Sequence, residues 1–197
     1  MNNMHTLELF ILKCAVIQTD LNSIQSIHAD SSVRFDDFIG DKLEPYIKQF
    51  ELENRQNASK MAHYYQIFYM LENDIREFIS KILESVHGKE WWENCVPQAV
   101  KDEAKKNRNR EEQAAITPRS DEGIDYTTFG QLSDIIRENW TDFAGVLSNQ
   151  SAVARVLSGL NMLRGTIAHC GVLGEDEVDR LKLAIRDWFR VLEGPKS

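Results

Sequence analysis

The chain has 197 residues, of which 42% are hydrophobic and 27% are charged, and its formal net charge is −8. This composition is typical of a globular protein and excludes a disordered one, while the negative charge excludes broad, non-specific attraction to nucleic acid. The three cysteines stand far apart in the sequence without grouped histidines, which argues against a disulfide framework or a zinc site.

The beginning of the chain predicts helices rather than a targeting segment. It lacks the basic region of a signal peptide, and charged residues from Glu8 onward interrupt the apolar stretch that follows, so we expect no membrane span and a cytoplasmic protein. Apolar residues at three- and four-residue intervals predict a first helix over 6–28. A similar pattern over 35–50 predicts a second helix, which Pro45 makes short or divided.

A polar stretch at 54–59 is either a linker or the exposed start of a helix. We place a boundary there, between an N-terminal helical extension at 1–57 and a helical domain at 58–197. From Met61 to Val86 the apolar positions form the longest amphipathic pattern in the chain, and Gly88 is a typical C-terminal signal. This pattern predicts a long central helix.

The next segment contains a short helix and a loop. Trp91 and Trp92 are interpreted as packing residues, and Pro97 opens a helix that we expect to reach about Arg110. Most of the polar stretch at 107–125 is predicted to be a mobile loop. It is followed by Thr128–Phe–Gly–Gln131, a capping box that predicts a helix starting at Phe129.

Two longer helices complete the predicted fold. Apolar positions from Val153 to Ile167 predict a helix that ends at Gly171, and an acidic first turn at Glu175 begins a last helix that reaches Leu192. No stretch alternates with period two, and no hairpin turn signal is present. We therefore predict an all-α protein, an up-and-down helical bundle with an N-terminal helical extension.

Arg164 and His169 are the first candidates for chemistry. They lie five residues apart, which places them about 140° apart around an ideal helix. One interpretation is structural, because a histidine in a last turn complements the helix dipole and an arginine is a common surface charge. In the other, Thr166 shares the face of His169 and Gly165 leaves that face open to a substrate, so that a cation and an imidazole could act on a phosphodiester.

An Arg-x-x-x-x-His motif, Arg164–Gly–Thr–Ile–Ala–His169, at the end of the penultimate helix of an all-α chain resembles the HEPN superfamily. The resemblance covers about 59–192 and is closest to the HEPN subgroup appended to a PIN nuclease domain in a transcript-surveillance endonuclease. The segments that carry this closer resemblance are Tyr65–Arg76, Trp91–Trp–Glu, Val96–Pro97, the helix at 128–140 and the last helix at 178–192.

The resemblance implies a metal-independent ribonuclease that needs no cofactor, with Arg164 and His169 from both chains of a homodimer converging on one RNA phosphate. A 2′-hydroxyl would attack the phosphorus, His169 would act as general base or acid, and Arg164 would hold the phosphate. The family usually has a polar residue, often Asn, Asp or His, directly after the arginine. Here that residue is Gly165, and Thr166 is an imperfect substitute.

Two further groups of residues could support this chemistry. Glu72, Asn73 and Arg76 form a polar cluster on the central helix, either as a surface salt bridge or as groups that orient Arg164 or His169. A set of basic residues could hold RNA, although interleaved acidic residues favour a solvated helix face. The members of this set are Lys101, Lys105, Lys106, Arg108 and Arg110.

Tyrosines at 64, 65 and 69 could stack on bases, but their helical spacing favours core packing.

Three hypotheses follow for the whole chain. The first is a HEPN-type ribonuclease, dimeric and acting on RNA, that serves as a toxin or an anti-phage effector with an antitoxin or a defence-system protein as partner. The second is an inactive HEPN-fold module that dimerises or binds RNA or a nucleotide. The third is a purely structural helical adaptor.

Overall fold

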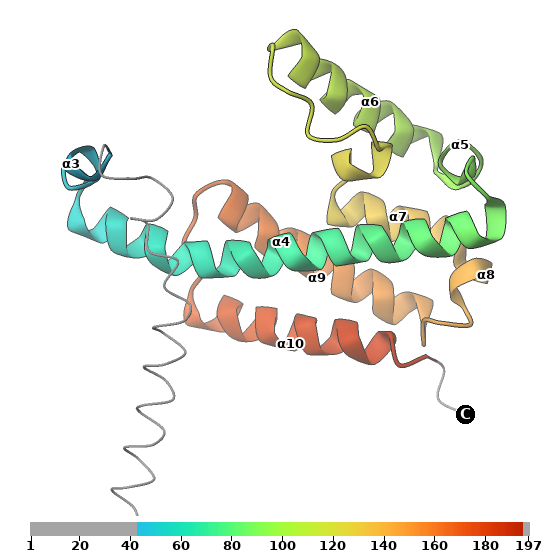
Figure 1. The fold of residues 1–197 in the computed structure, drawn as a ribbon. Helices are drawn as coiled ribbons and strands as arrows, with labels where there is room; N and C mark the ends of the chain where they lie inside the picture. Colours follow the sequence, from blue (N-terminus) through green and yellow to red (C-terminus); the bar gives the residue numbers. More distant parts are fainter. Residues whose placement is uncertain (1–42, 195–197) are drawn as a thin grey trace, which may run out of the picture. The chain divides into compact units, whose positions relative to one another are not determined.

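A computed structural model of the chain describes residues 43–194 (Figure 1). The chain divides into two compact units, 1–55 and 56–197. The helix predicted at 6–28 lies outside the described residues. In the first unit the described part contains α3 (Glu44–Ile47), a single turn with Pro45 near its start, so the second predicted element does have a short helix at its end.

The longest helix within 43–194 is α4 (Leu52–His87). It includes 54–59, so this polar stretch is the exposed start of a helix and not a linker. The helix ends as expected at Gly88, which has a φ of +74° and donates its N–H to the carbonyl of Glu84 at 2.9 Å. Five apolar residues of one face are buried in the core: Phe68, Leu71, Ile75, Ile79 and Leu83.

After α5 (Trp91–Cys95) comes α6 (Gln98–Gln113), which is longer than predicted. The prediction of a loop from residue 107 is wrong for 107–113, because the arginine, glutamate and glutamine residues that make up most of this stretch are polar but are good helix formers. Arg108 and Glu112 also form an ion pair at i,i+4 with an N–O distance of 3.2 Å. The loop is confined to 114–122 and is followed by a single 3₁₀ turn, η1 (Gly123–Tyr126).

The capping box at Thr128 is confirmed, and α7 (Phe129–Glu138) begins directly after it. A short helix, α8 (Trp140–Phe143), leads to α9 (Gln150–Ala168), whose first turn is capped by the side chain of Asn149 accepting from the N–H of Ala152. The last helix, α10 (Glu175–Val191), starts with three acidic residues as predicted. The described part of the chain is all-α and contains no strand.

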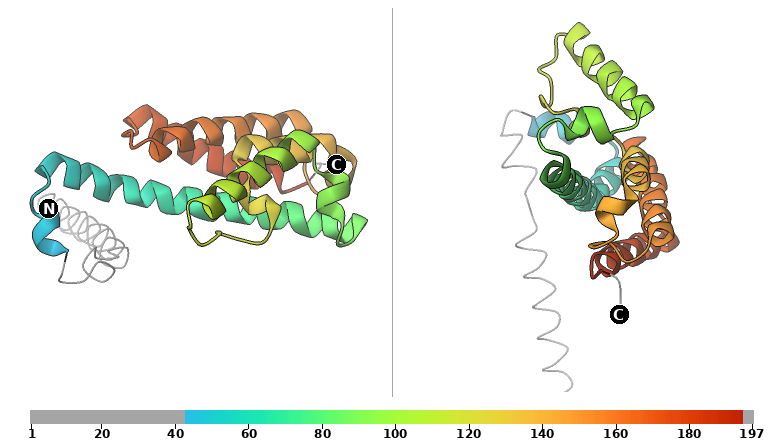
Figure 2. Two further views of the ribbon diagram at one scale, coloured as in Figure 1. Left: turned by 90° about the horizontal axis from the view of Figure 1, so that it is seen from above. Right: turned by 90° about the vertical axis from the view of Figure 1, so that its right-hand side faces the viewer.

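Helix α9 is the centre of the packing, because it contacts α7 on one side and α10 on the other (Figures 1 and 2). Aromatic contacts fix α4 to the same core: Phe68 packs edge-on against Phe129, and Phe78 packs edge-on against Trp188 with centroids 6.2 Å apart. Trp91 is also buried, as predicted. No helix within 43–194 is long and apolar enough to cross a membrane.

Candidate functional site

A cleft of about 430 Å³ lies between α4, the last two turns of α9 and the segment around η1. A volume of this size is within the range of small-ligand pockets. Three arginines and two acidic residues line it together with apolar and aromatic side chains, so the cleft carries both charge and a hydrophobic wall. Its lining residues are Tyr65, Phe68, Tyr69, Glu72, Asn73, Arg76, Arg119, Asp125, Arg164, Ile167 and Ala168.

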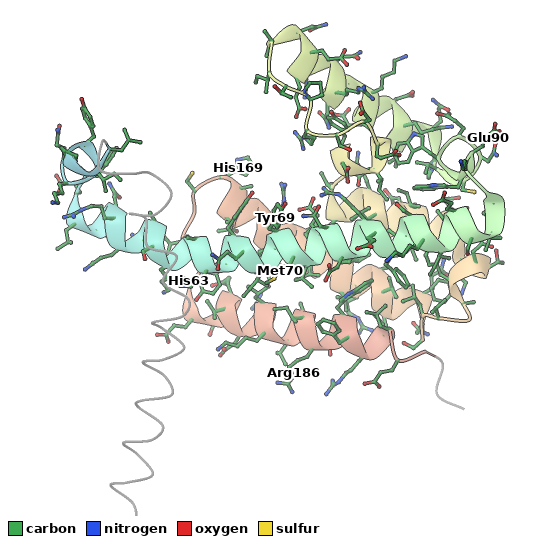
Figure 3. The ribbon with its side chains drawn as sticks, in the orientation of Figure 1. His63, Tyr69, Met70, Glu90, His169 and Arg186 are labelled. Carbon is green, nitrogen blue, oxygen red and sulfur yellow. The ribbon has the colours of Figure 1, made fainter. Side chains whose placement is uncertain are left out.

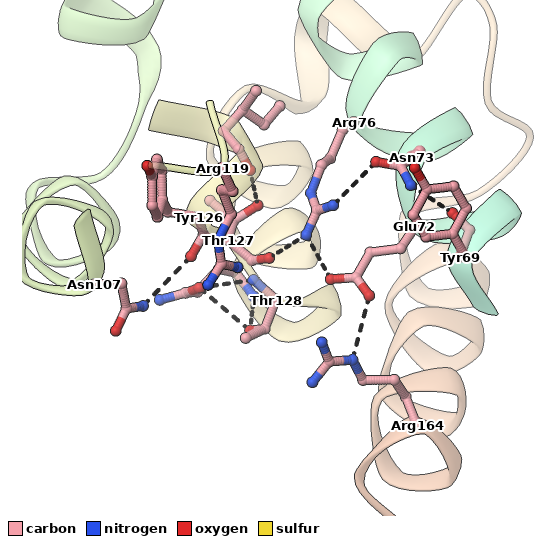
Figure 4. A network of polar contacts seen from close by, with 12 residues as sticks. Tyr69, Glu72, Asn73, Arg76, Asn107, Arg119, Tyr126, Thr127, Thr128 and Arg164 are labelled. Atoms are coloured by element: carbon pink, nitrogen blue, oxygen red, sulfur yellow. Dashed lines mark hydrogen bonds and ion pairs between the residues drawn. The ribbon is translucent and has the colours of Figure 1, made fainter. Parts of the chain in front are cut away.

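Glu72 joins two of these arginines (Figure 4). Its carboxylate is buried, and it accepts a hydrogen bond from Arg76 Nη2 at 2.6 Å and another from Arg164 Nε at 3.3 Å. A buried carboxylate needs such partners, because an unpaired charge in the interior is costly. The interpretation of Glu72 and Arg76 as a surface salt bridge is therefore wrong: the pair lies within the protein and reaches across to α9.

Arg76 is the more enclosed of the two arginines. It also donates to the carbonyl of Thr127 at 2.7 Å and to Asn73 Oδ1 at 3.3 Å, while its Nε is buried without a partner among the described residues. Burial lowers the pKa of the guanidinium, and the charges of Glu72 and Asp125 oppose that shift. Arg76 thus ties α4 to the start of α7 and has little freedom to bind anything else.

Arg164 is freer. Its side chain is 40% exposed, against 13% for Arg76, and only its Nε is engaged by Glu72. Its two terminal nitrogens make no hydrogen bond within the described part of the chain, as the close-up in Figure 4 shows. A guanidinium fixed at one nitrogen with two others available can grip two oxygens of an anion such as a phosphate.

His169 lies just beyond the last residue of α9, Ala168, where it is the C-cap, so the prediction that the helix ends at Gly171 is late by three residues. Two hydrogen bonds close the terminus in a Schellman motif: Gly171 N–H donates to Thr166 O at 2.8 Å, and Cys170 N–H to Ile167 O at 3.0 Å. Cys170 occupies the left-handed position of this motif with a φ of +60°. A Cβ on Gly171 would come within 2.7 Å of Thr166 Cγ2, so the close turn requires glycine there.

The ring of His169 is exposed and does not line the cleft (Figure 3). Thr166 is exposed as well, and Gly165 leaves open space where a side chain would begin, with no atom within 4 Å of an added Cβ. Within one chain the structure therefore brings Arg164 together with Glu72, Asn73 and Arg76, but it leaves His169 outside that group.

The predicted basic set lies on α6, away from this cleft. Three of its members are paired with carboxylates: Lys101 with Glu93, Lys106 with Glu103, and Arg108 with both Glu112 and Asp121. Lys105 and Arg110 line a separate shallow hollow on the same helix. The cations of the set therefore lie on a helix face that also carries acidic partners.

Sequence reasoning missed Arg119 and Asp125, which reach the cleft from the segment between α6 and α7. Arg119 donates three hydrogen bonds to Glu111 and packs its guanidinium over the Tyr126 ring, 5.1 Å from the centroid. Nothing in the sequence indicated this, because the segment has no periodicity and its fold depends on contacts with residues of α6 and η1.

The prediction that the three tyrosines of α4 pack in the core is wrong for two of them. Tyr65 and Tyr69 are exposed, whereas Tyr64 is half-buried and packs against the core. A helix of this length has a limited apolar face, and Tyr65 and Tyr69 lie at its edge, where they form one wall of the cleft.

Comparison with known proteins gives one family. A family model described as Swt1-like HEPN matches residues 66–193, which include the Arg164–His169 motif, all of α9 and α10, and every residue that lines the cleft except Tyr65. No curated protein and no solved structure gave a match. Within 43–194 no group of three histidine, cysteine or acidic side chains is arranged to hold a metal ion.

Proposed function

Because the chain belongs to the Swt1-like HEPN family, we propose that it is a metal-independent endoribonuclease. The observation that carries the proposal is the state of Arg164. The buried carboxylate of Glu72 fixes its Nε, while its terminal nitrogens remain available at a cleft large enough for a nucleotide. Such an arginine is positioned to bind a phosphate.

In the proposed mechanism the RNA supplies its own nucleophile. The 2′-oxygen loses its proton to His169 acting as general base, attacks the adjacent phosphorus and displaces the 5′-oxygen of the next nucleotide, which takes up a proton. The products are a 2′,3′-cyclic phosphate and a free 5′-hydroxyl. Arg164 neutralises the charge that gathers on the phosphoryl oxygens in the transition state. Glu72, Asn73 and Arg76 act on the substrate only through Arg164, which they position.

A second copy of the chain completes the proposed site, because His169 lies outside the cleft of its own chain. The exposed face of α9 is suited to such a partner. Its exposed large hydrophobic residue is Met162, at 75%, and Gly159 and Gly165 beside it leave open space for another helix to approach. Dimerisation along this face would bring the two copies of His169 together, because His169 lies about two helical turns beyond Met162 on the same side of α9.

The direct test is incubation of the purified protein with mixed RNAs in EDTA, followed by analysis of the RNA ends. We expect cuts that leave cyclic phosphates and a loss of at least about 100-fold in rate in His169→Ala, the usual contribution of a general acid or base. His63→Ala is the matched control, since His63 is also exposed and lies on α4. Cleavage that requires magnesium, or that survives in His169→Ala, would refute the mechanism.

The dimer has its own test. Met162→Glu places a charge on the exposed face of α9 without touching the core, so it should dissociate the dimer in sedimentation experiments and reduce cleavage in parallel. Leu183→Glu, at a similarly exposed position on α10, should do neither. A protein that is monomeric and active would contradict a site composed from two chains.

A second function is favoured by one observation, the absence of a polar side chain at Gly165. It is an inactive HEPN module that binds RNA or a nucleotide at the same cleft. Intact RNA with retained binding would favour this module, and the absence of both would favour a structural adaptor. A role as a toxin or anti-phage effector, with an antitoxin or defence protein as partner, belongs to the first function. It is tested by expressing the unmodified chain and an Arg164→Ala variant in cells.

A further inference from the structure

Tyr65 and Tyr69 form an exposed aromatic pair beside the cleft. They are one helical turn apart on α4, are 60% and 61% exposed, and their ring centroids lie 6.4 Å apart with the planes tilted by 40°. Met70 beside them is exposed as well (Figure 3). Large apolar side chains grouped on a surface in this way are unusual unless something covers them.

This pair lies where two hollows meet. One is the cleft that contains Arg164, and the other is an almost wholly apolar hollow of about 390 Å³ formed by Tyr65, Gln66, Tyr69 and Met70. Both tyrosines line both hollows. The surface therefore passes from guanidinium groups directly to flat aromatic rings.

A nucleotide has the matching pattern, since its phosphate is anionic and its base is a flat, weakly polar ring. We propose that Tyr65 and Tyr69 form a stacking platform for an unpaired nucleobase of the RNA whose phosphate binds at Arg164. The substrate class is then single-stranded RNA, because the base faces of a duplex are covered by their neighbours and cannot reach a side chain. The platform concerns the cleft of the proposed function and rests on it for the position of the phosphate.

Charge argues for this occupant over a second copy of the chain. The cores of protein interfaces are depleted in acidic residues, whereas the cleft next to Tyr69 is lined by Glu72 and Asp125 as well as by three arginines. The exposed α9 face around Met162 is also separate from the two hollows, since Met162 lines neither. A dimer on α9 would leave the tyrosines free for RNA.

The test measures binding without cleavage. Fluorescence anisotropy in EDTA would follow a short, labelled 2′-O-methyl RNA, which lacks the attacking hydroxyl, as a single strand, as a duplex, and as an abasic strand that keeps every phosphate. We expect the single strand to bind roughly five- to a hundred-fold more tightly than the abasic strand, the effect of stacking one base. The duplex should bind as weakly as the abasic strand.

The same assay on variants identifies the residues. Tyr65→Leu and Tyr69→Leu should lose the preference for bases and bind the single strand as weakly as the abasic strand. Tyr69→Trp keeps a flat ring at this position and should therefore retain the preference. Phe189→Leu is the matched control, because Phe189 is 58% exposed on α10 and lines neither hollow. Thermal unfolding should be unchanged in all four variants, since the replaced rings are exposed.

Three results would overturn the platform: a duplex bound as tightly as the single strand, tyrosine variants with the affinity of the unmodified protein, or tyrosine variants that dissociate a dimer without weakening RNA binding. The last would make a second copy the occupant. If His169→Ala cuts RNA normally while the tyrosine variants still lose binding, the proposed mechanism fails and the platform stands. If the tyrosine variants bind and cut normally, only the platform fails.

Discussion

Replacing Glu72 with glutamine should destabilise the protein by about 2–3 kcal/mol, although the two side chains have the same shape. Glu72 accepts a hydrogen bond at 2.6 Å from the enclosed Arg76, and one at 3.3 Å from the more exposed Arg164. Exchanging a charge-assisted bond for a neutral one costs about 1–1.5 kcal/mol at Arg76, and the screened pair with Arg164 adds up to about 1 kcal/mol. The guanidinium of Arg76 is also left without a buried counter-charge. This brings the total cost toward the lower end of the range of about 3–5 kcal/mol that is typical of a broken buried pair.

Glu77→Gln is a suitable control for this measurement. Glu77 pairs with Lys81 on the same helix, at the same i,i+4 spacing and the same 2.6 Å distance, but the two side chains are 62% and 72% exposed. Loss of this exposed ion pair should lower the free energy of unfolding by only a few tenths of a kcal/mol, about 0.5 kcal/mol at most.

Thermal unfolding followed by circular dichroism measures the difference. For a chain of this size, about 2–3 kcal/mol corresponds to a fall in Tm of about 5–10 °C, against about 1–2 °C for the control. RNA affinity should also fall in Glu72→Gln, because Arg164 loses its anchor. If Glu72→Gln and Glu77→Gln lower the Tm equally, the buried network stabilises the fold no more than an exposed ion pair does.

Three further predictions concern the helix end and the Arg119 segment. Cys170→Gly should raise the free energy of unfolding by about 0.5–1 kcal/mol in urea titrations, because glycine adopts the left-handed conformation at 170 without strain; a decrease would mean that the thiol packs favourably. Gly165→Asn fits without a clash and should raise the rate of RNA cleavage, and an unchanged rate would show that this position does not limit catalysis. Glu111 has a pKa below its usual value of 4.5 because Arg119 donates to it, so its contribution to stability is present above that pH and is lost as the pH falls through the lowered pKa. Stability below pH 4.5 should therefore fall more steeply in the unmodified protein than in Glu111→Gln, and equal slopes would contradict this.

The parts of the fold that were predictable are those decided by local chemistry. The capping box at Thr128, the glycine after α4 and the acidic first turn of α10 all act within a few residues of themselves, so the sequence contains the whole signal. The end of α6 lies beyond the predicted one because polarity alone does not distinguish a loop from a solvated helix. Residues 107–113 are polar, but most of their side chains favour a helix, and Arg108 pairs with Glu112 along it.

The cleft was only half predictable for a related reason. The i,i+4 spacing of Glu72 and Arg76 is visible in the sequence, but the contact of Glu72 with Arg164 joins residues 92 positions apart and depends on how α4 and α9 pack. Exposure of Tyr65 and Tyr69 likewise depends on where the neighbouring helices stop covering α4. Spacing shows which residues share a face, and tertiary packing decides whether that face is buried.

Arg164 is held in place by more contacts than His169 is, although both belong to one motif. Arg164 is attached to a buried carboxylate that is itself held by Arg76, whereas His169 is carried on a terminal turn that depends on a strained Cys170 and a closely packed Gly171. Fraying of that turn would displace the imidazole and leave Arg164 in place. In the proposed ribonuclease, one substitution at position 171 would therefore separate the cutting of RNA from the binding of RNA, which gives related chains a short evolutionary route from one function to the other.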